Sequence, residues 1–224
     1  MRPHPTEQHF TLARYAERLC DVESAVTGAL GVSEAAYREA VQAPWWPDPP
    51  RDHYGARPEL ARLIRAVVRL LRPATAVETG VAQGLTTAVI LQAMAENGGG
   101  RLYSVDVPPP VADDGYVGSL VPLRLRSRWT LRTGLSRDEL APLLAELGTI
   151  DLFLHDAEHR YESQMEEYEQ AWPRLRAGGQ LVTDDVDTPA FMDFAARVGG
   201  TPFLIGEVSS KSGVGLMRKP KGSP

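Results

Sequence analysis

At residues 78–87 the chain reads Glu-Thr-Gly-Val-Ala-Gln-Gly-Leu-Thr-Thr, and this stretch decides the fold. It follows a short apolar run from Ala74 to Glu78, and it leads into a helix-like segment from Leu85 to Glu96. The small residues at positions 80, 82 and 84 let a backbone turn tightly and approach a ligand closely. The stretch therefore predicts a strand, a tight turn, and a helix whose N-terminus faces that turn.

Outward from this stretch, strand and helix patterns alternate along the chain. Strands are expected at 101–106, 129–132, 150–154 and 180–183, and helices at 58–71, 137–147 and 162–176. Pro173 should kink the last helix and Gly178-Gly179 should end it, while 203–208 and 213–217 should pair as a hairpin. This order predicts an α/β, Rossmann-like, doubly wound and mainly parallel sheet, with an antiparallel C-terminal hairpin strand and N-terminal helices.

Composition narrows the class of protein. The chain has 224 residues, with 24 Lys and Arg against 29 Asp and Glu, and its net charge of −5 argues against a nucleic-acid partner. The single cysteine, Cys20, excludes an intrachain disulfide, and neither Met1 to Phe10 nor any longer stretch is apolar enough for a signal peptide or a membrane span. We therefore expect a cytoplasmic protein without a membrane partner, and we expect a homodimer as its assembly.

The turn after the first strand is compatible with one of two cofactor patterns. A dinucleotide site needs Gly-x-Gly-x-x-Gly, and here the third glycine would fall at Leu85, so that pattern fails. The pattern acidic-x-Gly-x-Gly-x-Gly is matched from Glu78, with Ala82 in place of one glycine. This spacing resembles motif I of class I methyltransferases, which bind S-adenosylmethionine (SAM). A carboxylate there suits the ammonium group of SAM and would repel a pyrophosphate.

Further cofactor contacts are expected at neighbouring strand ends. Asp106 ends the second strand, where a carboxylate can accept hydrogen bonds from both ribose hydroxyls. Ser136 follows the third strand and is a candidate neighbour of the adenine. A tight strand–helix turn alone would explain the glycines but not the acidic residues at both strand ends. The predicted cofactor-binding residues are Glu78, Gly80, Ala82, Gly84, Thr86, Asp106, Ser136 and Asp156.

A cluster of carboxylates is predicted at the ends of the fourth and fifth strands. In a doubly wound sheet these ends lie side by side, so Asp156, Asp184 and Asp185 should converge. Converging carboxylates repel one another unless a cation neutralises them or one is protonated. Oxygen-only ligands favour a hard ion such as Mg²⁺. In a simpler interpretation, Asp184 and Asp185 only cap a loop or a helix.

Two histidines flank the first of these carboxylates. His155 and His159 are four residues apart, as in zinc sites of the type His-Glu-x-x-His, but that motif needs a helix and His155 directly follows a strand. His159 lies in the loop after Asp156 and can act as a general base, since an imidazole titrates near neutral pH. A loop histidine on its own is more often a solvated surface group. We assign His159 and Asp156 as candidate catalytic residues.

At this point the chain resembles a known family from about Leu71 to Val186. It is similar to the metal-dependent O-methyltransferases that modify macrolide sugars, such as macrocin and mycinamicin O-methyltransferases, and more distantly to catechol O-methyltransferase. The most specific part is Asp156-x-x-His159-x-Tyr161, followed by Gly178-Gly179 before Asp184-Asp185. The resemblance implies that Asp156, Asp184 and Asp185 bind Mg²⁺ and that His159 is the base. Ala82 and the short N-terminal part depart from the family pattern.

These observations give an expected domain organisation. Residues 1–50, with a helix ending at Gly31, a second helix capped by Ser33 and a Pro-rich connector around Trp45-Trp46, should form a helical lid, substrate-binding or dimerisation segment. Residues 51–219 should form the SAM-binding methyltransferase domain, and residues 220–224 a flexible tail. The insertion at 108–128 is a second lid candidate, and its arginines 124, 126 and 128 should either meet an acidic substrate or form the wet face of a strand.

The expected function is SAM-dependent methylation of a hydroxyl on a small natural-product or sugar-like metabolite, with Mg²⁺ orienting and acidifying that acceptor. Two alternatives keep the fold: a metal-independent N- or carboxyl-methyltransferase, and a non-catalytic SAM-binding scaffold. A third, an NAD-dependent oxidoreductase, is disfavoured by Leu85.

Overall fold

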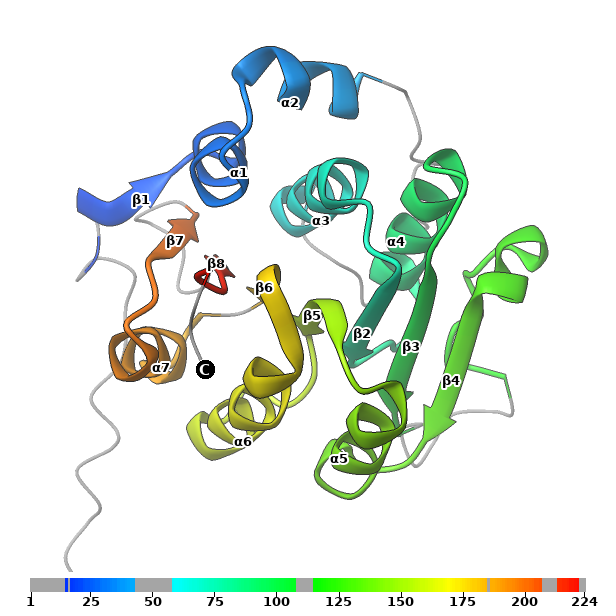
Figure 1. Ribbon diagram of the computed structural model, residues 1–224. Helices are drawn as coiled ribbons and strands as arrows, with labels where there is room; N and C mark the ends of the chain where they lie inside the picture. The colour runs from blue at the N-terminus through cyan, green and yellow to red at the C-terminus, as the bar shows by residue number, and fades with distance from the viewer. Residues whose placement is uncertain are drawn as a thin grey trace, which may run out of the picture.

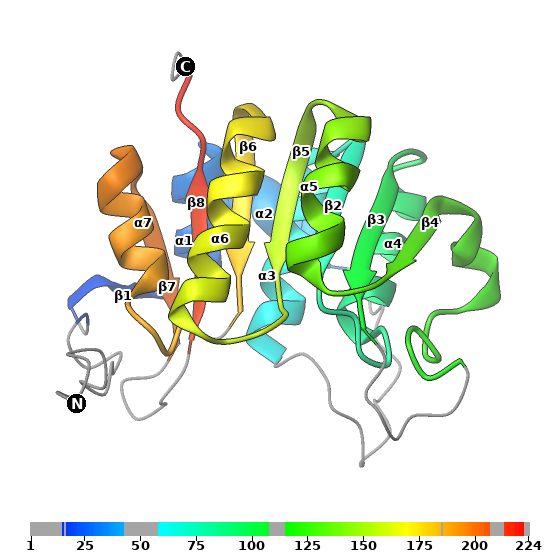
Figure 2. The ribbon, with the colours of Figure 1, turned by 90° about the horizontal axis from the view of Figure 1, so that it is seen from below.

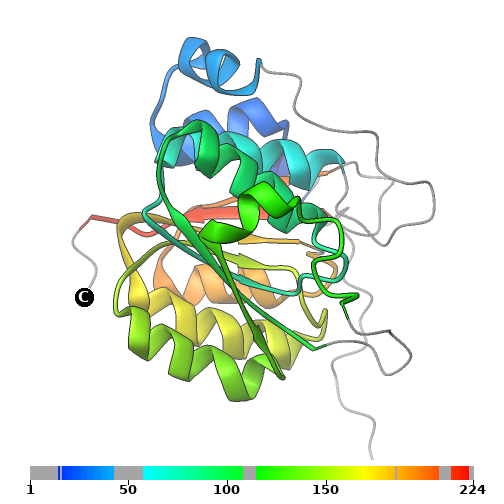
Figure 3. The same cartoon turned by 90° about the vertical axis from the view of Figure 1, so that its right-hand side faces the viewer.

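The computed structural model describes residues 15, 17–42, 58–107, 115–184, 186–206 and 213–221. Within these residues, an eight-stranded sheet lies between two layers of helices (Figures 1 and 3). The strand order is β1-β7-β8-β6-β5-β2-β3-β4. The strands are β1 (Leu19–Cys20), β2 (Thr75–Thr79), β3 (Arg101–Asp106), β4 (Trp129–Thr133), β5 (Ile150–His155), β6 (Leu175–Thr183), β7 (Pro202–Ile205) and β8 (Val214–Arg218).

The helices divide between the two faces of the sheet. One face carries α1 (Val22–Leu30), α2 (Glu34–Val41), α3 (Pro58–Leu71) and α4 (Leu85–Glu96), and the other carries α5 (Ser136–Leu147), α6 (Tyr161–Ala171) and α7 (Ala190–Val198) (Figure 1). Two 3₁₀ helices, η2 (Leu123–Arg128) and η3 (Trp172–Arg174), complete the described elements. Among the described residues no helix combines the length and apolarity needed to cross a bilayer.

The sheet is parallel from β6 to β4, and β8 runs antiparallel between β6 and β7. The predicted Rossmann-like fold with an antiparallel C-terminal hairpin is therefore confirmed. In register, Thr79 of β2 lies beside His155 of β5, which lies beside Thr183 of β6. The carboxyl ends of these strands consequently meet at one edge of the sheet, where ligands bind in such folds (Figure 2).

The N-terminal helices share the core of the main domain. Ala25, Val26 and Ala29 of α1 and Tyr37 of α2 belong to the same buried cluster as α3, α4 and the sheet. The predicted helix end at Gly31 (φ 68°) and the predicted cap at Ser33 are both confirmed. Asp21 caps α1, so Leu19–Cys20 is an edge strand where a helix was expected. The predicted lid or dimerisation role of residues 1–50 stays a prediction, and Trp45-Trp46 lies outside the described residues.

The predicted end of the α6 helix at Gly178-Gly179 is wrong. Regular helix stops at Ala171, because Pro173 cannot donate the next backbone hydrogen bond, and one 3₁₀ turn leads into β6. The Lys219 ammonium donates to the carbonyls of Trp172 and Pro173 and so satisfies two groups at this helix end. Gly178 (φ 80°) and Gly179 are part of β6 itself.

The arginines of the 108–128 insertion also differ from expectation. They lie on or beside the 3₁₀ helix η2 rather than on a strand. Arg126 donates to the carbonyls of Gly118 and Val121, Arg128 donates to the carbonyl of Gly100, and Arg124 donates to Gln92. These side chains hold the segment against α4 and β3, and residues 108–114 lie outside the described part.

Candidate functional site at the strand ends

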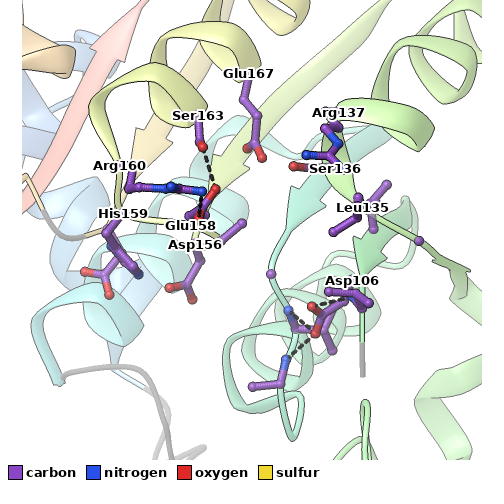
Figure 4. Close-up of a pocket in the computed structure, with 18 of the residues that line it drawn as sticks. Asp106, Leu135, Ser136, Arg137, Asp156, Glu158, His159, Arg160, Ser163 and Glu167 are labelled. Carbon is purple, nitrogen blue, oxygen red and sulfur yellow. Dashed lines mark hydrogen bonds and ion pairs between the residues drawn. The ribbon is translucent and has the colours of Figure 1, made fainter. Parts of the chain in front are cut away.

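A cavity of about 930 Å³ opens at the carboxyl ends of the parallel strands, and we call it the strand-end cavity (Figure 4). Its walls come from the β2–α4 turn, the end of β3, the β4–α5 turn, the β5–α6 loop and the first turns of α5 and α6. Its volume falls within the range of small-molecule sites, roughly 300–1,000 Å³. Of the predicted site residues, it is lined by Gly80, Ala82, Thr86, Asp106, Ser136, Asp156, His159 and Asp184.

The β2–α4 turn has the tight geometry that its small residues predict. Gly80, Ala82 and Gly84 all have positive φ values, of 82°, 47° and 88°. A Cβ at Gly80 would lie 1.9 Å from the carbonyl oxygen of Asp156, so only glycine fits there. At position 82 the left-handed backbone explains why glycine is usual in the motif, and Ala82 adopts it at a cost of about 1 kcal/mol. Gly84 makes the turn but does not line the cavity.

Asp106 holds this turn in place. Its Oδ2 accepts hydrogen bonds from the backbone amides of Val81 (3.0 Å) and Ala82 (2.7 Å), and its Oδ1 accepts one from Val107 (2.7 Å). A carboxylate offers about four lone-pair sites, so three amides leave it room to accept a ligand hydroxyl. Asp106 therefore shapes the cavity and also presents an acceptor to it.

Glu78 lies beneath the cavity rather than in its wall. Its side chain is fully buried, and Oε2 accepts hydrogen bonds from Thr87 (2.8 Å) and Ser104 (2.7 Å). Burial raises the pKa of Glu78 to about 7, against the lowering effect of these two hydroxyls, and the charge of Asp106 raises it further. The predicted contact between Glu78 and the cofactor stays a prediction, since this side chain faces α4 and β3.

On the α5 side, the wall combines apolar and polar groups. Val107 and Leu135 are large hydrophobic residues that are 48% and 41% exposed, and both line the cavity. Ser136 is the first residue of α5 and also lines the cavity. Across the cavity, on the side of the β5–α6 loop, Glu158 accepts a hydrogen bond from Ser163 (2.6 Å) and pairs with Arg160 (2.5 Å) (Figure 4). An apolar, partly exposed wall of this kind suits the flat face of an aromatic base.

The predicted carboxylate cluster is brought together in part. Asp156 and Asp184 both line the cavity, and the backbone amide of Asp184 donates to the carbonyl of His155 (2.9 Å), which joins the two strand ends. Thr86 donates to Oδ2 of Asp156 at 3.3 Å. Asp185 lies outside the described residues. Over the ranges that the structure covers, no three ligand-type side chains form a metal-binding group.

The two histidines have different surroundings. His159 lines the cavity beside Asp156. His155 is fully buried, and its Nδ1 is 2.7 Å from Oε2 of Glu167, with the ring 6.2 Å from that of His159 between centroids. His155 thus ends a strand, as the sequence indicated, and the two rings do not share the helical face that the zinc motif needs.

Glu167 is a cavity residue that the sequence interpretation missed. It lies on α6, is 2% exposed and lines the cavity. Besides His155, it accepts a hydrogen bond from Thr79 (2.5 Å). Its sequence signal is an acidic residue on the inward face of a helix, next to buried Tyr168. Because a buried charge needs partners, such a position indicates a polar site.

The pH dependence of stability in a Glu78 variant tests whether the burial of this carboxyl group raises its pKa. The pKa of this group is about 7 in the fold against the ordinary 4.5, so its protonated form is favoured in the native state. The raised pKa of Glu78 contributes fully to the free energy of unfolding below pH 4.5. This contribution is lost as the pH rises to 7, which lowers the free energy of unfolding by about 3 kcal/mol. In urea unfolding experiments, the free energy of unfolding of Glu78→Gln should therefore rise by that amount, relative to wild type, between about pH 4 and about pH 8. The control variant Glu169→Gln, at an exposed position, should show the same pH dependence of stability as wild type. If Glu78→Gln also shows the wild-type pH dependence, the raised pKa of Glu78 is contradicted.

Comparisons with known proteins place the cavity in context. A methyltransferase-domain family model matches residues 77–186, which run from β2 to the loop after β6. None of the curated proteins matches the chain.

Many solved structures are similar in fold, among them three that are described as O-methyltransferases. An O-methyltransferase from Bacillus cereus in complex with SAH is 17% identical, with a TM-score of 0.59, and the match covers 88% of this chain and 97% of that one. The O-methyltransferase TomG from Streptomyces achromogenes, involved in tomaymycin synthesis and bound to SAM, is 16% identical (TM-score 0.59; 98% and 100% covered). A putative caffeoyl-CoA O-methyltransferase from Staphylococcus aureus is 12% identical (TM-score 0.58; 82% and 90% covered). At these identities the likeness shows the fold alone.

Proposed function

We propose, on the premise that residues 77–186 form a methyltransferase domain, that the protein transfers the methyl group of SAM to a hydroxyl oxygen of a small molecule. The matched domain and the O-methyltransferase neighbours support a SAM-dependent methyltransferase. One observation carries the finer proposal: a single cavity is lined by the β2–α4 turn, by Asp106 and by Asp156, His159 and Asp184. Cofactor and acceptor groups would therefore meet in one space.

The cofactor would lie across the strand ends. In this proposal Asp106 accepts the ribose hydroxyls, and the adenine lies against Val107 and Leu135 near Ser136. The amino-acid end lies at the β2–α4 turn, near Gly80, Thr86 and Asp156. A direct check is binding of SAH by calorimetry, together with transfer of a labelled methyl group from SAM to a panel of hydroxylated natural-product and sugar acceptors. Binding without transfer to any acceptor would favour a non-catalytic scaffold.

Removing the ribose acceptor should weaken cofactor binding. Asp106→Ala deletes that acceptor and also releases the amides of Val81 and Ala82, so we expect at least a tenfold rise in the Kd for SAH, about 1.4 kcal/mol or more. Isothermal titration calorimetry measures this directly. Asp138→Ala, an exposed position on α5, serves as the control. An unchanged Kd in Asp106→Ala would refute the ribose assignment.

A divalent cation is part of the proposal, and the donor chemistry of two cavity residues supports it. Asp156 and Asp184 offer hard carboxylate oxygens to the same cavity, and Asp185 is the third proposed ligand. When bound, Mg²⁺ would lower the pKa of an acceptor hydroxyl and fix its direction. The chain's own contribution would be to hold these carboxylates on adjacent strand ends, which are joined by the hydrogen bond that the Asp184 amide donates to the His155 carbonyl.

Metal binding can be measured without turnover. We expect Mn²⁺, as a spectroscopic substitute for Mg²⁺, to bind the SAH complex with one site in electron paramagnetic resonance titrations. Asp184→Asn should weaken that binding at least tenfold, because it removes one charged ligand. Asp193→Asn on α7 lies outside the cavity and should behave as wild type. If wild type binds no Mn²⁺, or if turnover in EDTA equals turnover in Mg²⁺, a metal-independent methyltransferase is favoured instead.

His159 is the proposed general base. A ring nitrogen of His159 would take the acceptor's hydroxyl proton while the oxygen attacks the methyl carbon. The carbon–sulfur bond breaks, its electron pair stays on sulfur, and the products are a methyl ether and SAH. Because the reaction needs no covalent intermediate, alignment of the two substrates should supply much of the rate.

Loss of the base should affect chemistry and spare cofactor binding. We expect His159→Gln to slow single-turnover methyl transfer by about 100-fold or more, the usual contribution of a positioned base. Calorimetry should give a wild-type Kd for SAH, since this residue is not assigned to the cofactor. A single-turnover rate equal to that of wild type would remove His159 from the mechanism.

A further inference from the structure

Residues 116–121, which we call the 116–121 segment, lie directly on the β2–α4 turn. The Gly118 amide donates a hydrogen bond to the carbonyl of Ala82 (2.8 Å). The Leu120 amide donates one to the carbonyl of Gln83 (2.8 Å). Two backbone hydrogen bonds therefore join this segment to the turn that borders the strand-end cavity.

Gly118 is the point at which the segment is packed most tightly. A Cβ at Gly118 would lie 2.1 Å from Cη2 of Trp129, and a Cβ at Gly84 would lie 2.8 Å from the Gly118 Cα. Trp129 is held in turn, because its indole N–H donates to the Ser104 hydroxyl (2.9 Å). The Arg126 guanidinium donates to the Gly118 carbonyl (2.7 Å). With φ at 73°, position 118 admits only glycine, and the segment is a packed wall of the site.

The segment brings one aromatic side chain to the cavity. Tyr116 lines the cavity and is partly exposed. It lies two residues before Gly118, and two residues span about 7 Å at most. Ala82 is held from both sides, since its amide donates to Asp106 and its carbonyl accepts from Gly118. Tyr116 therefore belongs to the end of the cavity where Asp106 binds the turn (Figure 4).

The chemistry of a tyrosine ring restricts what it would contact at this position. Its faces are large and apolar, and its hydroxyl is at the far edge. In the proposed binding mode the ribose lies at Asp106 and the base extends toward Val107 and Leu135, whereas the charged amino-acid end lies near Asp156. The ribose carbons and the face of the adenine offer the apolar surface that a ring face needs. The nucleoside is therefore the part of the cofactor that fits Tyr116.

We infer that Tyr116 is a cofactor-binding residue whose ring packs against the nucleoside of SAM, and that the 116–121 segment braces the ring in this position. This inference rests on the proposed function. Because a ring face makes the contact, the tyrosine hydroxyl adds little to the affinity. The contact should contribute to the binding of any ligand that carries the adenosine group, whether or not an amino-acid end is attached.

Two probes separate the nucleoside from the rest of the cofactor. SAH is the whole demethylated cofactor, whereas 5′-methylthioadenosine keeps the adenosine and the thioether and lacks the amino-acid end. In calorimetry, Tyr116→Ala should raise the Kd of both probes at least about tenfold, because the aromatic contact is lost. Tyr116→Phe should stay within about threefold of wild type. The control Leu123→Ala, at a position that is 85% exposed and outside the cavity, should bind both probes as wild type does.

A second variant tests the brace and leaves the ring unchanged. Arg126→Ala removes the hydrogen bonds to the carbonyls of Gly118 and Val121, so the segment should move and the Kd of both probes should rise at least about threefold. Arg124→Ala is the matched control, because this arginine lies on the same 3₁₀ helix but donates to Gln92 instead. If Arg126→Ala binds both probes as well as Arg124→Ala does, the bracing role is refuted.

The remaining outcomes also decide the question. If Tyr116→Ala leaves both Kd values unchanged, the ring does not contact the cofactor and the inference is wrong. If Tyr116→Ala weakens the binding of SAH alone, or if wild type binds SAH but not 5′-methylthioadenosine, the assignment to the nucleoside is wrong. If Tyr116→Phe loses as much affinity as Tyr116→Ala, the hydroxyl and not the ring face makes the contact. In each case binding of SAH by wild type leaves the proposed function intact, whereas failure of wild type to bind either probe would overturn both.

Discussion

The strand-end cavity depends on the contact between the β2–α4 turn and its two neighbouring strand ends. Gly80 approaches the Asp156 carbonyl so closely that a Cβ would lie 1.9 Å from it, and Asp106 anchors the next two amides from the other side. This bracing holds a left-handed backbone at Ala82 that an isolated peptide would avoid. Since α4 begins at this turn, the same contact sets the direction in which the helix N-terminus points.

Acidic residues around this edge have different properties because their surroundings differ. Glu78 is enclosed between β2, β3 and α4, where burial dominates and raises its pKa. Glu167 is equally enclosed, but the hydrogen bonds and charge of its partners dominate and lower its pKa. Asp106 accepts hydrogen bonds from three backbone amides. Burial, hydrogen-bonding partners and backbone amides therefore give three carboxyl groups near one edge of the sheet different electrostatic environments.

Much of this edge could be predicted from local patterns. The apolar runs fixed where strands end, so the sequence predicted that residues 80–84, 106, 156 and 184 lie at one edge, and the register of β6, β5, β2 and β3 confirms it. Helix α7 was missed, and the Gly178-Gly179 pair was wrongly assigned to a helix end although it lies within β6. Glycine has the same local signature in both settings, so sequence alone did not separate them.

By itself, the sequence determined the order of elements, the tight turn and the residues that follow each parallel strand, because these depend on neighbours a few positions away. Only the tertiary structure decided which side chains face the cavity. Alternation along β2 buries Glu78 on the α4 side and directs Thr79 to the opposite side, where it meets Glu167 from 88 residues further along the chain. Such a pairing is set by how α6 packs on the sheet, and no local pattern encodes it.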